Sequence, residues 1–123
     1  MQGIVISGSG EGTKYTTLSW VKAQITKKLG FTPYPGTLNI KLTKDSLKNK
    51  KILQKAKGLE ISPKEGFCSG KCFHAFIGDF KCAIIVPDVN DYPEDTIEII
   101  ASVNSREKLK LEDGDLVKLQ VLL

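Results

Sequence analysis

The chain is poor in arginine, histidine and cysteine, and it has no long apolar run. Arg106 is its one arginine, His74 its one histidine, and Cys68, Cys72 and Cys82 its three cysteines. An odd number of cysteines without a secretory leader argues against a disulfide framework. No stretch approaches the roughly 18 apolar residues of a membrane-spanning helix, and the start, MQGIVISGSG, does not resemble a signal peptide. We therefore expect a cytoplasmic protein with no membrane partner.

The cysteines and the histidine also fall short of a standard zinc or nucleophile pattern. Cys68, Cys72 and His74 are close in the sequence, but the tight cysteine pairs and the fourth ligand that zinc usually requires are missing. A catalytic Ser/His/Asp or Cys/His system would have to use His74, which lies in FHAFI, a segment typical of a half-buried strand. We interpret all three residues as structural or incidental.

The composition indicates one globular domain, residues 1–123. The chain is 41% hydrophobic and 26% charged, and it has no repeat, low-complexity linker or second domain. Its net charge of +4 favours a phosphate-bearing ligand but is far from that of a nucleic-acid-binding tail. Much of the excess lies in the lysine-rich segment 44–57. Such a run is usually the solvated face of a helix or loop, and a patch that attracts phosphate is the alternative.

Hydrophobic patterns predict a mostly β fold with six or so strands and one main helix. Apolar residues recur at helical spacing over 18–29, with Thr17 as the N-cap and Gly30 at the C-terminal end. Asn104 and Glu107 are typical of a second helix start. The expected strands are 4–6, 37–42, 59–61, 71–77, 80–87, 96–101 and 116–123, with a hairpin turn at Gly78 and Asp79. Without a βαβ rhythm, this order favours a β-barrel or a compact mixed sheet.

Three features carry polar groups suited to a ligand. The segment SGSGEGTKY, residues 7–15, has glycines that would let backbone N–H groups approach phosphate, although it fits neither the Walker nor the dinucleotide pattern. Thr37 and Asn39 share one strand face and offer neutral oxygens, which suit magnesium already carried by a nucleoside triphosphate. Glu98 lies opposite Ile97 and Ile99 and would supply a carboxylate if its face lined a pocket. A plain loop and an ordinary strand surface remain the alternatives.

Several motifs in this order resemble the archaeal CTP-dependent riboflavin kinases over nearly the whole chain. They are GSGEGxxY, LGFTPYPGTLNIKL, AIIVP, TIEIIA and SREKLKLEDGDLVKL. The resemblance implies a compact six-stranded cradle-loop β-barrel that transfers the γ-phosphate of CTP to the 5′-hydroxyl of riboflavin, giving FMN and CDP. We expect the protein to be a monomer. It makes Thr37 and Asn39 ligands of Mg²⁺. It places Asn90 and Glu98 on the flavin, and Glu98 is the expected catalytic residue.

The resemblance also implies two nucleotide-binding segments. The expected residues are Gly8, Ser9, Gly10, Glu11, Gly12, Thr13 and Lys14 in the glycine loop, and Ser102, Val103, Asn104, Ser105, Arg106 and Glu107 after the strand 96–101. The chain departs from the family pattern at three positions, and its glycine loop carries one extra residue, Thr13 or Lys14, before Tyr15. Asn90 stands where threonine is expected, and Ser102 and Ser105 stand where proline and leucine are expected.

The alternative hypothesis is a non-catalytic β-barrel module that binds a nucleotide or DNA. The segment DGDLVKLQV also resembles the swapped-hairpin transcription regulators, and the net charge would permit contact with DNA. The chain has one arginine and no obvious helix-turn-helix, so it lacks a recognisable DNA-reading element. We therefore expect no nucleic-acid partner.

Overall fold

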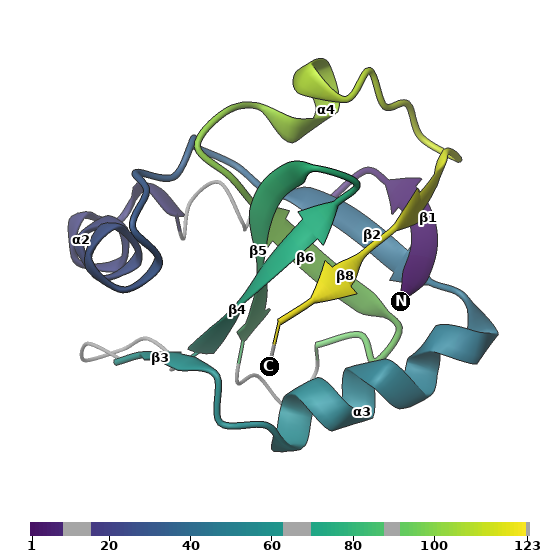
Figure 1. Ribbon diagram of the computed structural model, residues 1–123, viewed down its shortest axis with the longest axis horizontal. Coiled ribbons are helices and arrows are strands. Elements are labelled where there is room, and N and C mark those ends of the chain that lie inside the picture. Colours follow the sequence, from purple (N-terminus) through teal and green to yellow (C-terminus); the bar gives the residue numbers. More distant parts are fainter. Residues whose placement is uncertain (9–15, 63–69, 88–91, 123) are drawn as a thin grey trace.

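The computed structural model describes residues 1–8, 16–62, 70–87 and 92–122, and its centre is an antiparallel sheet (Figure 1). Eight strands form the sheet in the described part of the chain. They are β1 (Gln2–Ile6), β2 (Leu38–Leu42), β3 (Leu59–Ile61), β4 (Gly70–Ile77), β5 (Phe80–Pro87), β6 (Thr96–Ile100), β7 (Leu116–Lys118) and β8 (Gln120–Val121). The mostly β prediction is confirmed.

The strand order makes the sheet barrel-like. Its path runs β3-β4-β5-β6-β2-β1-β7, and β8 pairs with β4. Only Leu119 separates β7 from β8, so the C-terminal segment contacts β1 at one point and β4 at the next. The predicted single strand 116–123 is therefore interrupted, so the described part of the structure has eight strands where the sequence patterns indicated seven and the family resemblance implied six. Leu119 exchanges backbone hydrogen bonds with Met1 at the interruption.

Strand alternation produces a core inside the sheet and a second one outside it. The inner core contains Leu38, Ile40 and Leu42 of β2 together with Ile97 and Ile99 of β6. The outer core lies under α2 (Ser19–Leu29), the helix on the left of Figure 1. The α2 residues in it are Val21, Ile25 and Leu29, and the sheet residues are Ile61, Cys72, Ala83, Ile85 and Ile100.

The ends of α2 bear out one prediction and contradict another. Gly30 ends the helix in the left-handed conformation, with φ of 81°, as expected. The N-cap is Leu18, not Thr17, and no side chain caps this end. The Leu18 carbonyl instead accepts hydrogen bonds from the backbone N–H groups of Val21 and Lys22. Backbone hydrogen bonds therefore set the start of the helix. The preference of N-caps for residues such as threonine pointed to Thr17 and so predicted the wrong residue.

The lysine-rich segment forms the 3₁₀ turn η1 (Lys44–Ser46) and a second main helix, α3 (Leu47–Lys55), at the bottom of Figure 1. The prediction of a solvated face holds for lysines 44, 48, 51, 55 and 57, which are exposed. It is wrong for Lys50, whose residue is 2% exposed. None of the helices in the described part of the chain has the length and apolar character of a membrane span.

Candidate active site

The strand pair β2–β6 brings Thr37, Asn39 and Glu98 together on the outer face of the sheet. Asn39 is the register partner of Glu98. The Thr37 hydroxyl donates a hydrogen bond to Glu98 Oε1 at 3.0 Å. Leu38 and Ile40 of β2 lie in the inner core, as do Ile97 and Ile99 of β6. Since side chains alternate between the two faces of a strand, Asn39 and Glu98 face outward, and Thr37, two residues before Asn39, lies on the same side. The alternation read from the sequence therefore produces a cluster of one carboxylate and two neutral oxygen donors.

Tyr92 is a further member of this cluster that sequence reasoning missed. Its hydroxyl donates to Glu98 Oε2 at 2.9 Å. Burial raises the pKa of Tyr92, and the negative charge and hydrogen bond of Glu98 raise it further, so the phenol stays protonated and remains a donor. Tyr92 lies in an acidic loop without hydrophobic periodicity, and no local pattern indicated this role. Each oxygen of the Glu98 carboxylate thus has a fixed donor.

Gly8, the first residue of the glycine loop and the only one of residues 8–14 that the structure describes, lies against the Asn39 amide. A Cβ atom added at Gly8 would be 2.3 Å from Asn39 Nδ2 and 2.7 Å from Asn39 Cγ, far inside van der Waals contact. Only a residue without a side chain allows this approach. The structure therefore joins the start of the expected phosphate loop to one of the expected metal ligands.

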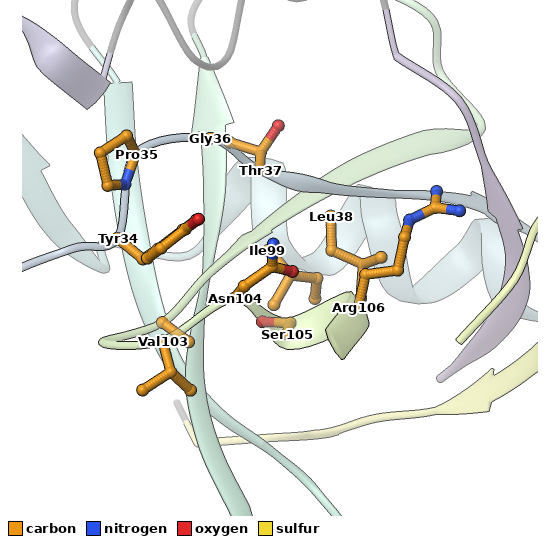
Figure 2. Close-up of a pocket in the computed structure, with 11 residues that line it drawn as sticks. Tyr34, Pro35, Gly36, Thr37, Leu38, Ile99, Val103, Asn104, Ser105 and Arg106 are labelled. Carbon is orange, nitrogen blue, oxygen red and sulfur yellow. The ribbon is translucent and has the colours of Figure 1, made fainter. Parts of the chain in front are cut away.

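A pocket of about 180 Å³ opens beside this cluster, where β2 begins and β6 ends. Figure 2 shows the segment from Tyr34 to Leu38 on one side of it and the segment from Val103 to Arg106 on the other. A backbone hydrogen bond from Tyr34 N to Ala101 O, 2.8 Å long, ties the two sides together. Ile99 and Ala101 add an apolar lining. The pocket thus lies between residues 33–36, with the sequence PYPG, and the segment 102–107.

The short helix α4 (Ser105–Lys108) shapes one wall of this pocket. Its N-cap is Asn104, whose Oδ1 accepts a hydrogen bond from the backbone N–H of Glu107, as the sequence predicted. Ser105 is buried, Asn104 and Arg106 are half-buried, and Ser102, Val103 and Glu107 are exposed. A polar, capped turn thus lies next to the apolar lining of the pocket.

Asp113 connects the two segments that were expected to bind the nucleotide. Ser7 Oγ donates to Asp113 Oδ2 at 2.5 Å, and Arg106 Nη1 lies 2.9 Å from Asp113 Oδ1. These two donors, Ser7 first and Arg106 second, hold the pKa of Asp113 below its usual value. The carboxylate therefore joins the strand leading into the glycine loop to the wall of the pocket.

Some predicted residues lie outside the described part of the chain. They are Ser9, Gly10, Glu11, Gly12, Thr13, Lys14, Cys68 and Asn90. Two described cysteines, Cys72 and Cys82, are buried, and burial raises the pKa of each thiol to about 12. His74 is half-buried in β4, as expected. Among the described residues, no group of three or more His, Cys, Asp or Glu side chains could hold a metal ion.

The assembled groups are better suited to binding a phosphorylated ligand than to nucleophilic catalysis or to zinc binding. A carboxylate with fixed donors can accept a hydrogen bond from a hydroxyl group. The Thr37 hydroxyl donates its hydrogen bond to Glu98, so its oxygen lone pairs remain free to accept a hydrogen bond or to coordinate a metal ion. This geometry defines a class of protein: a barrel-like β domain that carries oxygen ligands, a carboxylate and a small pocket at one rim.

The sequence comparisons identify the family within this class. Residues 5–121 match the family model CTP-dep_RFKase, described as "Domain of unknown function DUF120". The chain therefore belongs to the CTP-dependent riboflavin kinase domain family. It is 42% identical to a riboflavin kinase of Pyrobaculum calidifontis over 98% of this chain and 59% of that protein. Similar proteins include the riboflavin kinases of Methanosarcina barkeri, 36% identical over 98% of this chain and 56% of that protein, and Archaeoglobus fulgidus, 38% identical over 100% and 54%. The chain thus spans less than two thirds of these curated relatives.

Proposed function

We propose that this domain transfers the γ-phosphate of CTP to the 5′-hydroxyl of riboflavin, giving FMN and CDP. The observation that carries the proposal is the cluster of Thr37, Asn39 and Glu98, with Gly8 against Asn39 at its edge. Phosphoryl transfer depends mainly on positioning and on neutralising charge, so it needs no protein nucleophile. Membership of the family and the riboflavin kinase relatives support the same reaction.

Each part of the site has a role in this proposal. The pocket of about 180 Å³ is smaller than most whole-ligand sites, so it would hold one ring of the nucleotide, with the segment 102–107 against the cytosine. The backbone of the glycine loop, residues 8–14, would hold the phosphates. Asn90 and Glu98 would bind riboflavin. Glu98 either accepts the proton of the ribityl hydroxyl or only orients the flavin, and these two roles predict different kinetic effects.

The donor set of the site fits a bound divalent cation. Thr37 Oγ1 and the Asn39 amide oxygen would hold Mg²⁺, which prefers oxygen ligands and commonly combines one or two protein groups with substrate phosphates. When bound, the ion would neutralise charge on the triphosphate. The hydrogen bond from Thr37 to Glu98 would keep both side chains in the orientation that such binding requires.

The direct test is an assay of the protein with riboflavin, Mg²⁺ and each nucleoside triphosphate. We expect FMN with CTP and much less with ATP. Equal or better activity with ATP would refute the selectivity for CTP, and no FMN with any nucleotide would refute the kinase assignment.

Variants at the two oxygen donors test the metal site. Thr37→Val and Asn39→Leu should lower activity at low Mg²⁺ by about tenfold or more, and higher Mg²⁺ should restore part of it, because mass action offsets weaker coordination. Thr26→Val, on the exposed surface of α2, is the matched control. Full activity of Thr37→Val and Asn39→Leu at low Mg²⁺ would exclude these two side chains from the metal site.

A further inference from the structure

Lys50 is a buried cation whose partners all lie at the entrance to β6. Its ammonium group donates to the backbone carbonyl of Thr96 at 2.7 Å and lies 3.4 Å from those of Pro93 and Glu94. The residue is only 2% exposed. Burying a lysine head is costly unless its donors are satisfied, and these three carbonyls satisfy them. The side chain therefore fixes the turn 93–96 from the side of α3.

The same ammonium group also contacts Tyr92. It lies 5.2 Å from the centre of the Tyr92 ring, within the range of a cation–π contact. The Tyr92 hydroxyl, at the other end of the ring, donates to Glu98 Oε2. Lys50, Tyr92 and Glu98 thus form a continuous chain of contacts. It runs from a helix on one side of the turn to the carboxylate of the candidate site.

The charges around Lys50 agree with this geometry. Burial lowers the pKa of Lys50, while the carboxylates of Asp95, Glu94 and Glu98 oppose that change. An apolar side chain at position 50 would continue the stripe of Leu47 and Leu53 on α3 without any desolvation cost. The contacts of the Lys50 ammonium group with the turn 93–96 and with the Tyr92 ring therefore explain why a lysine occupies this position.

We propose that Lys50 and Tyr92 are positioning residues for the Glu98 carboxylate and tune the riboflavin side of the site. The inference rests on the proposed function. Lys50 holds the turn that precedes Glu98 and the ring of Tyr92, and Tyr92 fixes one carboxylate oxygen while Thr37 fixes the other. Because the nucleotide pocket is built from other residues, removing Lys50 or Tyr92 affects riboflavin and leaves CTP binding unchanged.

Steady-state kinetics of Tyr92→Phe and Lys50→Met test this separation. Loss of a hydrogen bond to a charged group should raise the KM for riboflavin or lower kcat by about tenfold. The KM for CTP should stay within about twofold of the wild-type value. Lys51→Met makes the same chemical change at the exposed neighbouring position of α3 and should behave as wild type. Equal changes in both KM values, or wild-type kinetics of Tyr92→Phe, would overturn the inference.

A Glu98→Gln background distinguishes positioning from general destabilisation. If Lys50 acts through Glu98, then Lys50→Met should have much less effect on riboflavin kinetics when Glu98 is already replaced. A purely structural role of Lys50 would give the same additional loss in both backgrounds, and that result would overturn the inference. Tyr92→Phe keeps the test decisive if Lys50→Met does not fold.

An NMR measurement separates failure of this inference from failure of the proposed function. The side-chain carboxyl carbon signal of Glu98 should shift in Tyr92→Phe and in Lys50→Met, but not in Lys51→Met, whether or not the protein phosphorylates riboflavin. If the wild-type protein makes no FMN and these shifts appear, the proposed function fails and the positioning stands. Unchanged signals in both variants would overturn the positioning.

Discussion

The contact between Gly8 and the Asn39 amide determines how closely two parts of the candidate site approach each other. A Cβ at Gly8 would be 2.3 Å from Asn39 Nδ2, and real Cβ atoms do not come so close to another atom. The flexible Asn39 side chain would have to move, and its amide oxygen would leave its present position. The size of one residue thus controls the geometry of a proposed metal ligand.

Gly8→Ala should therefore lower kinase activity without much loss of stability. We expect activity at low Mg²⁺ to fall by about tenfold, with partial recovery at high Mg²⁺ and a nearly unchanged Tm. Activity across a magnesium titration, beside a thermal melt, checks this.

Gly30→Ala is the matched control for this substitution. Gly30 has a φ of 81° and nothing within 4 Å of an added Cβ, so alanine there should cost about 1 kcal/mol of stability through backbone strain. Its activity at 25 °C should be unchanged. A Gly8→Ala protein with wild-type activity at low Mg²⁺ would contradict the role given to this contact.

Strand alternation was enough to predict which residues of β2 and β6 face the site. It placed Thr37 and Asn39 opposite Leu38 and Ile40, and the structure adds the register that sets Asn39 beside Glu98. Tyr92 was not predictable, because its contact with Glu98 depends on the path of a loop. The sequence does contain an indication that Lys50 is buried, because Lys50 lies three residues from both Leu47 and Leu53 and so on the same face of α3.

Among the elements, the short helix α4 affects the pocket most directly, because its first residues and its cap form part of the pocket wall. Four residues form it, and the Asn104 side chain provides its N-terminal cap. So short a helix has little stability of its own. The shape of the pocket wall therefore depends on the cap and on the packing of buried Ser105.

Asn104→Ala should weaken this wall. Loss of the cap should lower the free energy of unfolding by about 1 kcal/mol and raise the KM for CTP, because the capped turn lines the pocket. Asn104→Ser supplies another capping oxygen and should keep both values near wild type. Chemical denaturation and nucleotide kinetics on both variants test this. A serine variant with restored stability but a raised KM would show that the amide itself contacts the nucleotide.

The elements themselves were predicted more completely than their ends. The hairpin of β4 and β5, the strands β2 and β6 and the cap at Asn104 follow from local patterns and are confirmed. The N-cap at Leu18 and the interruption at Leu119 were not predicted. Both depend on backbone contacts with other residues, which hydrophobic periodicity does not encode.

On the scale of the whole molecule, Asp113 joins distant parts of the chain at the rim of the sheet. It bonds to Ser7, which is 106 residues away in the sequence, and to Arg106 beside the pocket. Its pKa lies below the ordinary value because these donors favour the ionised form. The carboxylate therefore stabilises the folded state when it is charged.

Asp113→Asn should lower Tm near neutral pH by no more than a few degrees, because the group is exposed. The sign follows from the lowered pKa: the contribution is complete above the unfolded-state pKa of about 3.9 and is lost as the pH falls through the lower native value. The Tm difference between wild type and variant should therefore shrink below about pH 4.

Thermal melts from pH 7 to pH 2 measure this difference. Asp79→Asn in the exposed hairpin turn is the control for the change in net charge. A Tm difference for Asp113→Asn that stays constant over this range would contradict the assignment.

The pairing of β1 with β7 also has a consequence for synthesis on the ribosome. Met1 and Leu119, which exchange backbone hydrogen bonds, are 118 residues apart. At ordinary translation rates, roughly ten seconds separate their appearance. During that interval β1 can pair with β2. The edge of β1 that later pairs with β7, and the part of β4 that later pairs with β8, still lack these partners. Unpaired strand edges invite association with other chains, so the nascent chain is most exposed to aggregation just before β7 and β8 emerge.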